Sequence, residues 1–318
     1  MIVVATDGSG SFCSIQDAVN SIEVLPETIF VKKGIYHERL EIQSPFLTIE
    51  GEDPQNTILE YDYYAEMLMN EQEKRGTFRT YTMLVHTDHF TCKNMTIANT
   101  AGFGSKVGQA ISVYAEGDKI SFQNCRILGH QDTLFTGPLP EKELKPGGFK
   151  GPTEHAPRKI GRQLYQDCYI EGEVDFIFGS STAYFENCEL HSLDRGTDIN
   201  GFVTAASSYP GQHYGYVFHD CRFTSNCPDH TVYLGRPWRN HAKTVLINCY
   251  LGPHIKPEGF HDWDKPEAHQ TIDYAEYNCS GPGYQPDKRA SFVRQLTLEE
   301  ASDYTFEKVW AATPLECR

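Results

Sequence analysis

The segment Phe122-Gln123-Asn124-Cys125-Arg126-Ile127 is one copy of a pattern that recurs along this chain. The pattern is an apolar residue, any residue, Asn or Asp, Cys, any residue and a second apolar residue. Four more copies centre on Cys168, Cys188, Cys221 and Cys249. Successive cysteines of the set are 43, 20, 33 and 28 residues apart, and an earlier copy has Met95 at the Cys position. The repeat unit is therefore irregular in length but constant in its central strand.

This repeat decides the fold class. Alternation of apolar and polar residues indicates a half-buried strand, and Asn or Asp in its middle supplies a turn residue that tolerates the left-handed conformation. Recurrence at such intervals is typical of a solenoid or a propeller. The regular four-strand unit of a propeller blade is missing. The sequence therefore predicts an all-β fold, a parallel β-helix in which equivalent positions of successive coils stack into ladders.

The two ends and two interruptions complete the predicted organisation. Apolar residues at 15, 18, 19 and 22 favour an N-terminal helix that covers the first coil, with Ser14 as N-cap. The capping box Thr297-Leu298-Glu299-Glu300 indicates a short C-terminal helix. Polar stretches near 62–81 and 137–160 interrupt the repeat as surface loops. We expect one domain over residues 1–318 with these two loop insertions.

Composition excludes several classes of protein. The chain has 318 residues and a net charge of −15, which disfavours binding to nucleic acid. No run of eighteen apolar residues is present, so we expect no membrane span, and we expect a monomer. The N-terminus lacks a secretion signal, which predicts a cytoplasmic protein if the chain is full length and a secreted or periplasmic one if a signal was removed.

The ten cysteines contain no C-x-x-C pair, and buried free thiols are favoured over disulfides.

Candidate catalytic groups lie in three segments. These are Gly129-His130-Gln131-Asp132-Thr133-Leu134-Phe135, Gly172-Glu173-Val174-Asp175-Phe176-Ile177-Phe178-Gly179 and Leu234-Gly235-Arg236-Pro237-Trp238. Asp132 and Asp175 each follow a repeat cysteine by seven residues, so stacked coils place the two carboxylates side by side. The alternative is that each is a solvated turn residue. No H-E-x-x-H, G-x-S-x-G or phosphate-binding loop is present, and we predict no metal and no cofactor.

In these three blocks the chain closely resembles the pectin methylesterases, which are right-handed β-helical carbohydrate esterases. The resemblance extends from Asp7-Gly8-Ser9-Gly10-Ser11-Phe12, through Gly108-Gln109-Ala110-Ile111, to Leu296-Thr297-Leu298-Glu299-Glu300-Ala301, and so covers nearly the whole chain. It implies hydrolysis of the C6 methyl esters of homogalacturonan or of methylated oligogalacturonides, with release of methanol. The other readings left open are a carbohydrate-binding solenoid and an esterase acting on acetyl or thioester groups.

The same resemblance implies roles for seven residues. Asp175 matches the nucleophile and Asp132 the general acid and base. Gln109 and Gln131 match the amides that stabilise the oxyanion, and Arg236 matches the partner of the nucleophile. Trp238 and Phe178 match aromatic residues that contact sugar rings. We expect Arg236 to lower the pKa of Asp175, and the charge on Asp175 to raise that of Asp132.

Two features of this chain bear on its choice of substrate. The insertions near 62–81 and 137–160 are longer than the family pattern leads us to expect, and both are close in sequence to catalytic blocks. We expect them to line one or both ends of the substrate cleft and to favour short methylated oligomers over polymer. The charge of −15 predicts a preference for neutral, methylated or short substrate, unless a local basic cleft overrides it.

Overall fold

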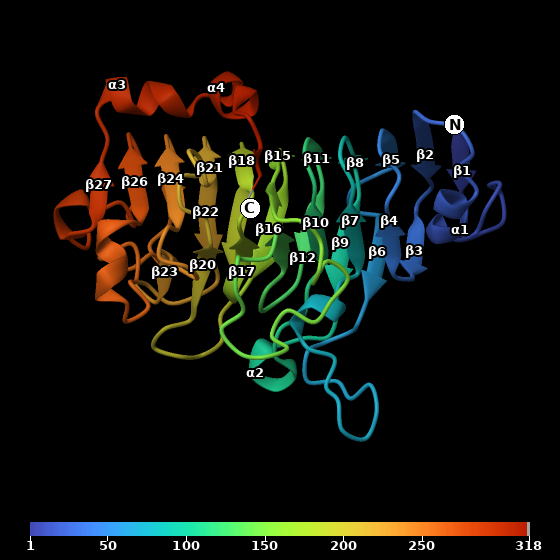
Figure 1. The fold of residues 1–318 in the computed structure, drawn as a ribbon, viewed down its shortest axis with the longest axis horizontal. Coiled ribbons are helices and arrows are strands. Elements are labelled where there is room, and N and C mark those ends of the chain that lie inside the picture. Colours follow the sequence, from blue (N-terminus) through green and yellow to red (C-terminus); the bar gives the residue numbers. More distant parts are fainter. Residues whose placement is uncertain (317–318) are drawn as a thin grey trace.

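The repeat builds a stack of coils, each of which adds strands to long parallel sheets (Figure 1). The computed structural model describes residues 1–316. Three parallel sheets of 11, 8 and 7 strands run along the molecule, and the order of strands in each sheet follows the order of the coils. This arrangement is a parallel β-helix, as the sequence predicts.

The strands of the three sheets have the following bounds. The 11-stranded sheet contains β1 (Ile2–Val4), β2 (Glu27–Val31), β5 (Leu47–Gly51), β8 (Thr91–Lys93), β11 (Ile120–Gln123), β15 (Arg162–Gln166), β18 (Thr182–Glu186), β21 (Tyr216–His219), β24 (Lys243–Ile247), β26 (Asp273–Tyr277) and β27 (Val293–Gln295). The 8-stranded sheet contains β3 (Gly34–His37), β6 (Thr57–Tyr61), β9 (Thr96–Asn99), β12 (Arg126–Leu128), β16 (Tyr169–Gly172), β19 (Glu189–Ser192), β22 (Arg222–Ser225) and β25 (Tyr250–Leu251). The 7-stranded sheet contains β4 (Leu40–Ile42), β7 (Met83–His86), β10 (Val113–Glu116), β13 (Leu134–Thr136), β17 (Val174–Gly179), β20 (Gly201–Ala206) and β23 (Val232–Gly235).

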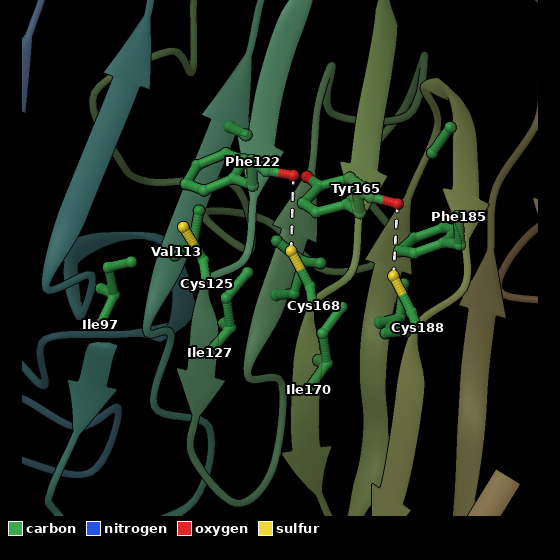
Figure 2. Packing of buried hydrophobic residues seen from close by; sticks show 14 of the residues in the cluster. Ile97, Val113, Phe122, Cys125, Ile127, Tyr165, Cys168, Ile170, Phe185 and Cys188 are labelled. Carbon is green, nitrogen blue, oxygen red and sulfur yellow. Dashed lines mark hydrogen bonds between the residues drawn. The ribbon is translucent and has the colours of Figure 1, made fainter. Parts of the chain in front are cut away.

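The repeat cysteines form a ladder inside the coils. Figure 2 shows Cys125, Cys168 and Cys188 in one row, next to a row of aromatic rings. The Sγ–H groups of Cys168 and Cys188 donate to main-chain carbonyls of the preceding coil, at 3.4 and 3.2 Å. All nine cysteines among the described residues are free thiols, and the five repeat cysteines are buried. The prediction of buried thiols is confirmed for the repeat cysteines, whereas Cys13 is exposed and Cys227 is partly buried.

The turn residue of the repeat has the conformation that its chemistry predicts. Seven Asn or Asp residues at this position have φ between 49° and 54°: Asn94, Asn124, Asp167, Asn187, Asp220, Asn248 and Asn278. Asn278 belongs to a further copy of the repeat that sequence reasoning missed, because Glu276 and Gly281 replace its apolar flanking residues. The residues at these turns hydrogen-bond along the stack, as in the 2.8 Å bond from Asn124 Nδ2 to Asn94 Oδ1.

A short helix covers the N-terminal coil, as predicted. Helix α1 (Ile15–Asn20) buries Ile15, Ala18 and Val19 against the core, and the Ser14 side chain caps it by accepting from the Asp17 N–H. The Glu38 carboxylate accepts from the Ile15 N–H at 2.7 Å and so satisfies another free donor of the first turn.

The C-terminal segment runs back over the 11-stranded sheet (Figure 1). Helix α3 (Leu298–Ala301) has the predicted Thr297 capping box, and α4 (Phe306–Ala311), which sequence reasoning missed, packs Val309 against that sheet. The chain then forms β28 (Leu315–Glu316), which pairs with β14 (Lys159–Ile160) of the second insertion. The remaining helices are α2 (Gly104–Val107), η1 (Thr77–Arg79), η2 (Pro266–Gln270), η3 (Pro286–Lys288) and η4 (Ser302–Tyr304).

Both insertions pack on the outer face of the 7-stranded sheet. Phe78 of the first insertion and Phe149 of the second join a buried cluster with Tyr114 and Phe135, which point outward from β10 and β13. The Phe78 and Phe149 ring centroids are 5.9 Å apart, and the Lys150 ammonium pairs with Glu73 at 3.2 Å. The two insertions therefore form one layer over the outer face of the 7-stranded sheet, in contact with Phe135 and Phe178 of the candidate catalytic blocks.

Candidate active site

Stacking of the coils places the two candidate aspartates side by side. Strands β13 and β17 pair with Leu134 opposite Ile177, which puts Asp132 opposite Asp175 in the same register. The Asp132 N–H donates to the Val174 carbonyl at 3.1 Å. Each aspartate is only 8% exposed, so neither is a solvated turn residue. The carboxylate pair inferred from the equal offsets is present.

At both aspartates the backbone departs from the extended conformation of a strand, and this changes the direction of the side chains. Asp132 and Asp175 have φ of 64° and 51°, a conformation that Asp tolerates better than most residues. In β17 the register with β20 shifts between Val174 and Ile177. A bulge of this kind re-aims side chains, and here Phe176 and Ile177 both join the core. The bulge thus leaves Asp175 on the outer face of the sheet.

Arg236 binds the Asp175 carboxylate through a bidentate pair of hydrogen bonds. Its Nε donates to Oδ1 at 2.8 Å and its Nη2 donates to Oδ2 at 2.7 Å. The guanidinium lies over the rings of Phe202 and Trp263, at 3.9 and 3.7 Å from their centroids. Planar guanidinium groups favour both contacts, so the orientation of Asp175 is fixed.

The two carboxyl groups have different proton affinities. Burial raises the pKa of Asp132 well above its ordinary value, and the charge on Asp175 raises it further. Burial also raises the pKa of Asp175, while hydrogen bonds from Arg236 and its charge oppose this rise. Arg236 thus lowers the pKa of Asp175, as expected, but burial outweighs the arginine and the net shift is upward. The expected order holds, since Asp132 has the larger upward shift.

All seven residues predicted for the site line one cavity of about 400 Å³. They are Gln109, Gln131, Asp132, Asp175, Phe178, Arg236 and Trp238. Phe178 is only 3% exposed and lies with its centroid 5.7 Å from that of Trp238, so it supports the Trp238 ring more than it offers a face of its own. The main chains that carry the two glutamines are joined by a 3.0 Å hydrogen bond from the Ala110 N–H to the Gln131 carbonyl.

A buried acid connects the segments that carry these amides. Glu173 is 1% exposed, and its carboxylate accepts from the Gly104 N–H at 3.0 Å and lies 3.1 Å from His130 Nδ1. Gly104 lies against the Gln131 side chain, and a Cβ atom at Gly104 would be 2.6 Å from Gln131 Cβ. Glu173 and Gly104 therefore restrict where the Gln131 amide can lie.

Both insertions contribute to the cavity, as the sequence analysis expects. The first supplies Thr77 and Phe78, and the second supplies Leu144, Lys145, Gly148 and Phe149. Sequence reasoning did not single out these residues, nor Arg239 and Trp263, which also line the cavity. Phe78 and Phe149 are aromatic residues in otherwise polar loops, and this was the feature of the sequence that could have identified them as cavity residues.

The residues around the aspartates carry an excess of positive charge. Lys265 lies with its ammonium 4.7 Å from the Trp263 centroid and donates to the Pro237 carbonyl at 2.7 Å. Burial, together with the charges of Arg239 and Arg236, lowers the pKa of Lys265 to about 8. Arg239 and Lys145 add two more cations.

One group of side chains near the site has the geometry of metal ligands. Among residues 1–316, the donor atoms of His261, Asp262 and Asp264 lie within 4.8 Å of one another. Asp262 already pairs with His269 at 3.0 Å, and His261 Nδ1 accepts from the Trp263 N–H. We assign no metal to this group.

Within the described chain, no helix is long and apolar enough to cross a membrane.

Comparison with known proteins identifies the family. The family model described as Pectinesterase matches residues 1–139 and 156–312. The chain belongs to the pectinesterase family. Pectinesterase 31 of Arabidopsis thaliana is 35% identical to it over 314 residues, which cover 96% of this chain and 90% of the relative. Pectinesterases are carboxylic-ester hydrolases, so the chain is an enzyme of that class, and pectin demethylesterification is the reaction of its family.

Solved pectin methylesterases share the fold. The carrot enzyme superposes with a TM-score of 0.83 at 26% identity, over 98% of this chain and 92% of its own. A pectin methylesterase in complex with a hexasaccharide superposes with a TM-score of 0.80 at 28% identity, over 99% and 98%. The family model leaves out residues 140–155, which lie within the second insertion.

Proposed function

We propose that this pectinesterase hydrolyses C6 methyl esters of homogalacturonan or of methylated oligogalacturonides through an acyl-enzyme. The observation that carries the proposal is the buried pair Asp132 and Asp175, of which only Asp175 is held by Arg236. Two carboxyl groups with separated proton affinities allow one to react as a carboxylate while the other stays protonated.

In the first half-reaction, an Asp175 oxygen attacks the ester carbonyl carbon. The carbonyl oxygen gains negative charge, which the N–H groups of Gln109 and Gln131 stabilise by about 3–4 kcal/mol for each good donor. The bond from carbon to the methoxy oxygen then breaks, and Asp132 gives its proton to the departing methoxide, so that methanol leaves. An anhydride between Asp175 and the galacturonate carboxyl remains.

In the second half-reaction, the Asp132 carboxylate takes a proton from water as that water attacks the galacturonate carbonyl of the anhydride. The bond to the Asp175 oxygen breaks and returns Asp175 as a carboxylate beside Arg236. Asp132 is left protonated for the next turnover. The scheme needs only these side chains and water, with Trp238 as the aromatic surface against which a sugar ring packs.

The two insertions favour short substrate in this proposal. They pack together on the sheet beside the aspartates and supply one side of the cavity. A cavity bounded in this way accommodates an oligomer or a chain end more readily than the middle of a long polymer. Rates of methanol release from methylated polymer and from methylated hexamers test this preference, and equal rates per ester group would contradict it.

Methanol release by Asp175→Asn tests the central proposal. We expect a loss of at least about 1,000-fold in kcat, because the amide is not a nucleophile. The matched control is Asp220→Asn, which makes the same change at an exposed repeat turn with φ of 54°. Methanol release near the wild-type rate by Asp175→Asn would exclude Asp175 as the nucleophile. Release of acetate but not methanol from acetylated, methylated pectin would favour the other-ester alternative.

We also propose that the chain acts as a single domain and as a monomer that binds neither nucleic acid nor membranes. The charge of −15 supports the exclusion of polyanions. Size-exclusion chromatography with light scattering tests the monomer. The substrate bears on the compartment, because polymeric pectin does not enter cells: preference for polymer would place the enzyme outside the cytoplasm, whereas preference for oligomers is compatible with a cytoplasmic enzyme.

A further inference from the structure

His130 and Glu173 form a buried pair next to the catalytic residues, and the proposed reaction does not use it. His130 precedes Gln131 in the sequence, and Glu173 is two residues before Asp175. The Glu173 side chain is 1% exposed and that of His130 is 23% exposed. Among residues 1–316, His130 is the only basic side chain within ion-pair distance of Glu173. A buried carboxylate is costly without partners, so the contacts of Glu173 indicate what it does here.

Both oxygens of the Glu173 carboxylate are engaged. Oε2 accepts from the Gly104 N–H at 3.0 Å, and Oε1 lies 3.1 Å from His130 Nδ1. Because an ionised carboxylate only accepts, Nδ1 is the donor in this bond. The His130 ring also lies against Phe103, with the ring centroids 4.8 Å apart. A separate 2.8 Å bond from the Glu173 N–H to the His130 carbonyl joins the two main chains. Removal of the His130 side chain therefore frees Oε1 without breaking this main-chain connection.

The Gln131 amide lies beside the same carboxylate. A Cβ atom at Gly104 would be 2.7 Å from Gln131 Oε1 and 3.2 Å from Glu173 Oε2, so these two oxygens flank one Cα atom. In the part of the chain that the structure describes, no hydrogen bond fixes the Gln131 side chain. With Oε1 on the side of Glu173, the N–H groups of Gln131 point the other way and are free to stabilise the oxyanion.

A free oxygen on Glu173 would favour the opposite orientation of this amide. The oxygen and nitrogen ends of an amide have nearly the same shape, so a half-turn of the amide costs little in packing. The turned amide would donate to the carboxylate in a charge-assisted bond and would present Oε1, an acceptor, to the oxyanion. We propose that His130 is a positioning residue, whose bond to Glu173 keeps this carboxylate from turning the N–H groups of Gln131 away from the oxyanion.

This inference rests on the proposed function, because it concerns an amide that stabilises the oxyanion there, and it adds a positioning residue to that reaction. The carbonyl oxygen of the ester gains its negative charge in the transition state and does not have it in the bound ester. Loss of the His130 donor should therefore lower kcat and leave KM nearly unchanged.

The kinetics of methanol release from a fully methylated hexagalacturonate test the inference. His130→Phe keeps a ring against Phe103 but removes the donor, and we expect kcat to fall about tenfold while KM changes by less than about twofold. In His130→Asn the side-chain nitrogen replaces Nδ1 as the donor to Glu173, so kcat should stay within about threefold of the wild-type value. His191→Phe is the matched control, because it also removes a ring nitrogen from a 2.9 Å hydrogen bond, to Thr224, and does not line the cavity.

A double variant separates the effect of the carboxylate from that of packing around His130. Glu173→Gln keeps an acceptor for the Gly104 N–H, and its amide nitrogen can donate to Gln131 Oε1, which favours the productive orientation. His130→Phe combined with Glu173→Gln should therefore have a higher kcat than His130→Phe alone.

Three results would overturn the inference. These are a kcat in His130→Phe equal to that in His191→Phe, a loss in His130→Asn as large as that in His130→Phe, and a double variant no more active than His130→Phe. Gln131→Ala distinguishes these results from failure of the proposed function. A wild-type protein that releases no methanol, or a wild-type kcat in Gln131→Ala, would overturn the proposed reaction or its oxyanion contact. An impaired Gln131→Ala beside an unimpaired His130→Phe would overturn only the role of His130.

Discussion

Arg236 donates hydrogen bonds to both oxygens of Asp175 but none to Asp132 among the described contacts, so the arginine distinguishes two carboxyl groups that are equally buried. Burial raises the pKa of both groups, and only at Asp175 does a hydrogen-bonded cation oppose that rise. As the pH increases, Asp175 therefore loses its proton first. This order gives a pH window in which Asp175 is ionised and Asp132 is protonated, as the proposed reaction requires.

Removal of the arginine should narrow that window from its acid side. In Arg236→Gln the carboxylate of Asp175 loses its cation, so its pKa rises further. The acid limb of the kcat/KM profile then moves to higher pH, while the alkaline limb, assigned to Asp132, moves less. Arg222→Gln, at an arginine that lies over the Tyr250 ring and does not line the cavity, is the control. Movement of the alkaline limb alone would contradict the assignment.

Asp132 should reduce the stability of the folded protein at neutral pH. Its folded-state pKa is raised, so its contribution to stability is fully present below the unfolded-state pKa and is lost as the pH rises through the folded-state pKa. Asp132→Asn removes this loss, and Asn tolerates the φ of 64°. We expect the variant to have a higher Tm than the wild type at pH 8 and an equal one at pH 3.5. A variant less stable at pH 8 would contradict the assigned direction.

The sequence is most informative where one residue type has one physical role. Asn at a repeat turn and Cys in a ladder predict the coils because φ near 50° favours Asn, and a small side chain fits between stacked strands. Equal offsets from the ladder then place Asp132 opposite Asp175. Residues outside the repeat, such as Phe149 and Lys145, have no such register. Their positions depend on packing between two loops that no local pattern specifies.

The pKa of Asp175 shows a different limit of prediction from sequence. Pairing with Arg236 is implied by the motif, but the direction of the net shift depends on how deeply the pair is buried. Burial is set by Phe202 and Trp263, which enclose the guanidinium. Trp263 is distant from the motif in sequence, so the charge environment of the nucleophile becomes visible only in the folded structure.

Glu116 should make the anchoring of the second insertion depend on pH. It is 5% exposed, Thr153 of the insertion donates to it at 2.6 Å, and burial raises its pKa to about 7 against the opposing charge of Arg158. The contribution of Glu116 to the stability of the folded protein is therefore fully present below the ordinary carboxyl pKa and is lost as the pH rises through 7. Glu116→Gln keeps an acceptor for Thr153 and should remove a pH-dependent loss of roughly 3 kcal/mol.

Urea denaturation at pH 5 and pH 8 measures this effect. The difference in unfolding free energy between the two pH values should be smaller in Glu116→Gln than in the wild type. Glu143→Gln, at an exposed position of the same insertion, is the control and should leave the difference unchanged. An unchanged difference in Glu116→Gln would show that Glu116 does not titrate in this range.

Gly104 should be required for the position of the Gln131 amide. A Cβ atom at residue 104 would be 2.6 Å from Gln131 Cβ and 2.7 Å from its Oε1, so Gly104→Ala must displace that side chain. Displacement of an oxyanion donor weakens a contact that is strongest in the transition state. We therefore expect kcat to fall by about 10- to 100-fold with a smaller change in KM. Ser105→Ala, at the exposed next position of α2, is the control. Ala suits a helix better than Gly, so the substitution should not unfold α2. A wild-type kcat in a folded Gly104→Ala protein would therefore mean that Gln131 does not stabilise the oxyanion.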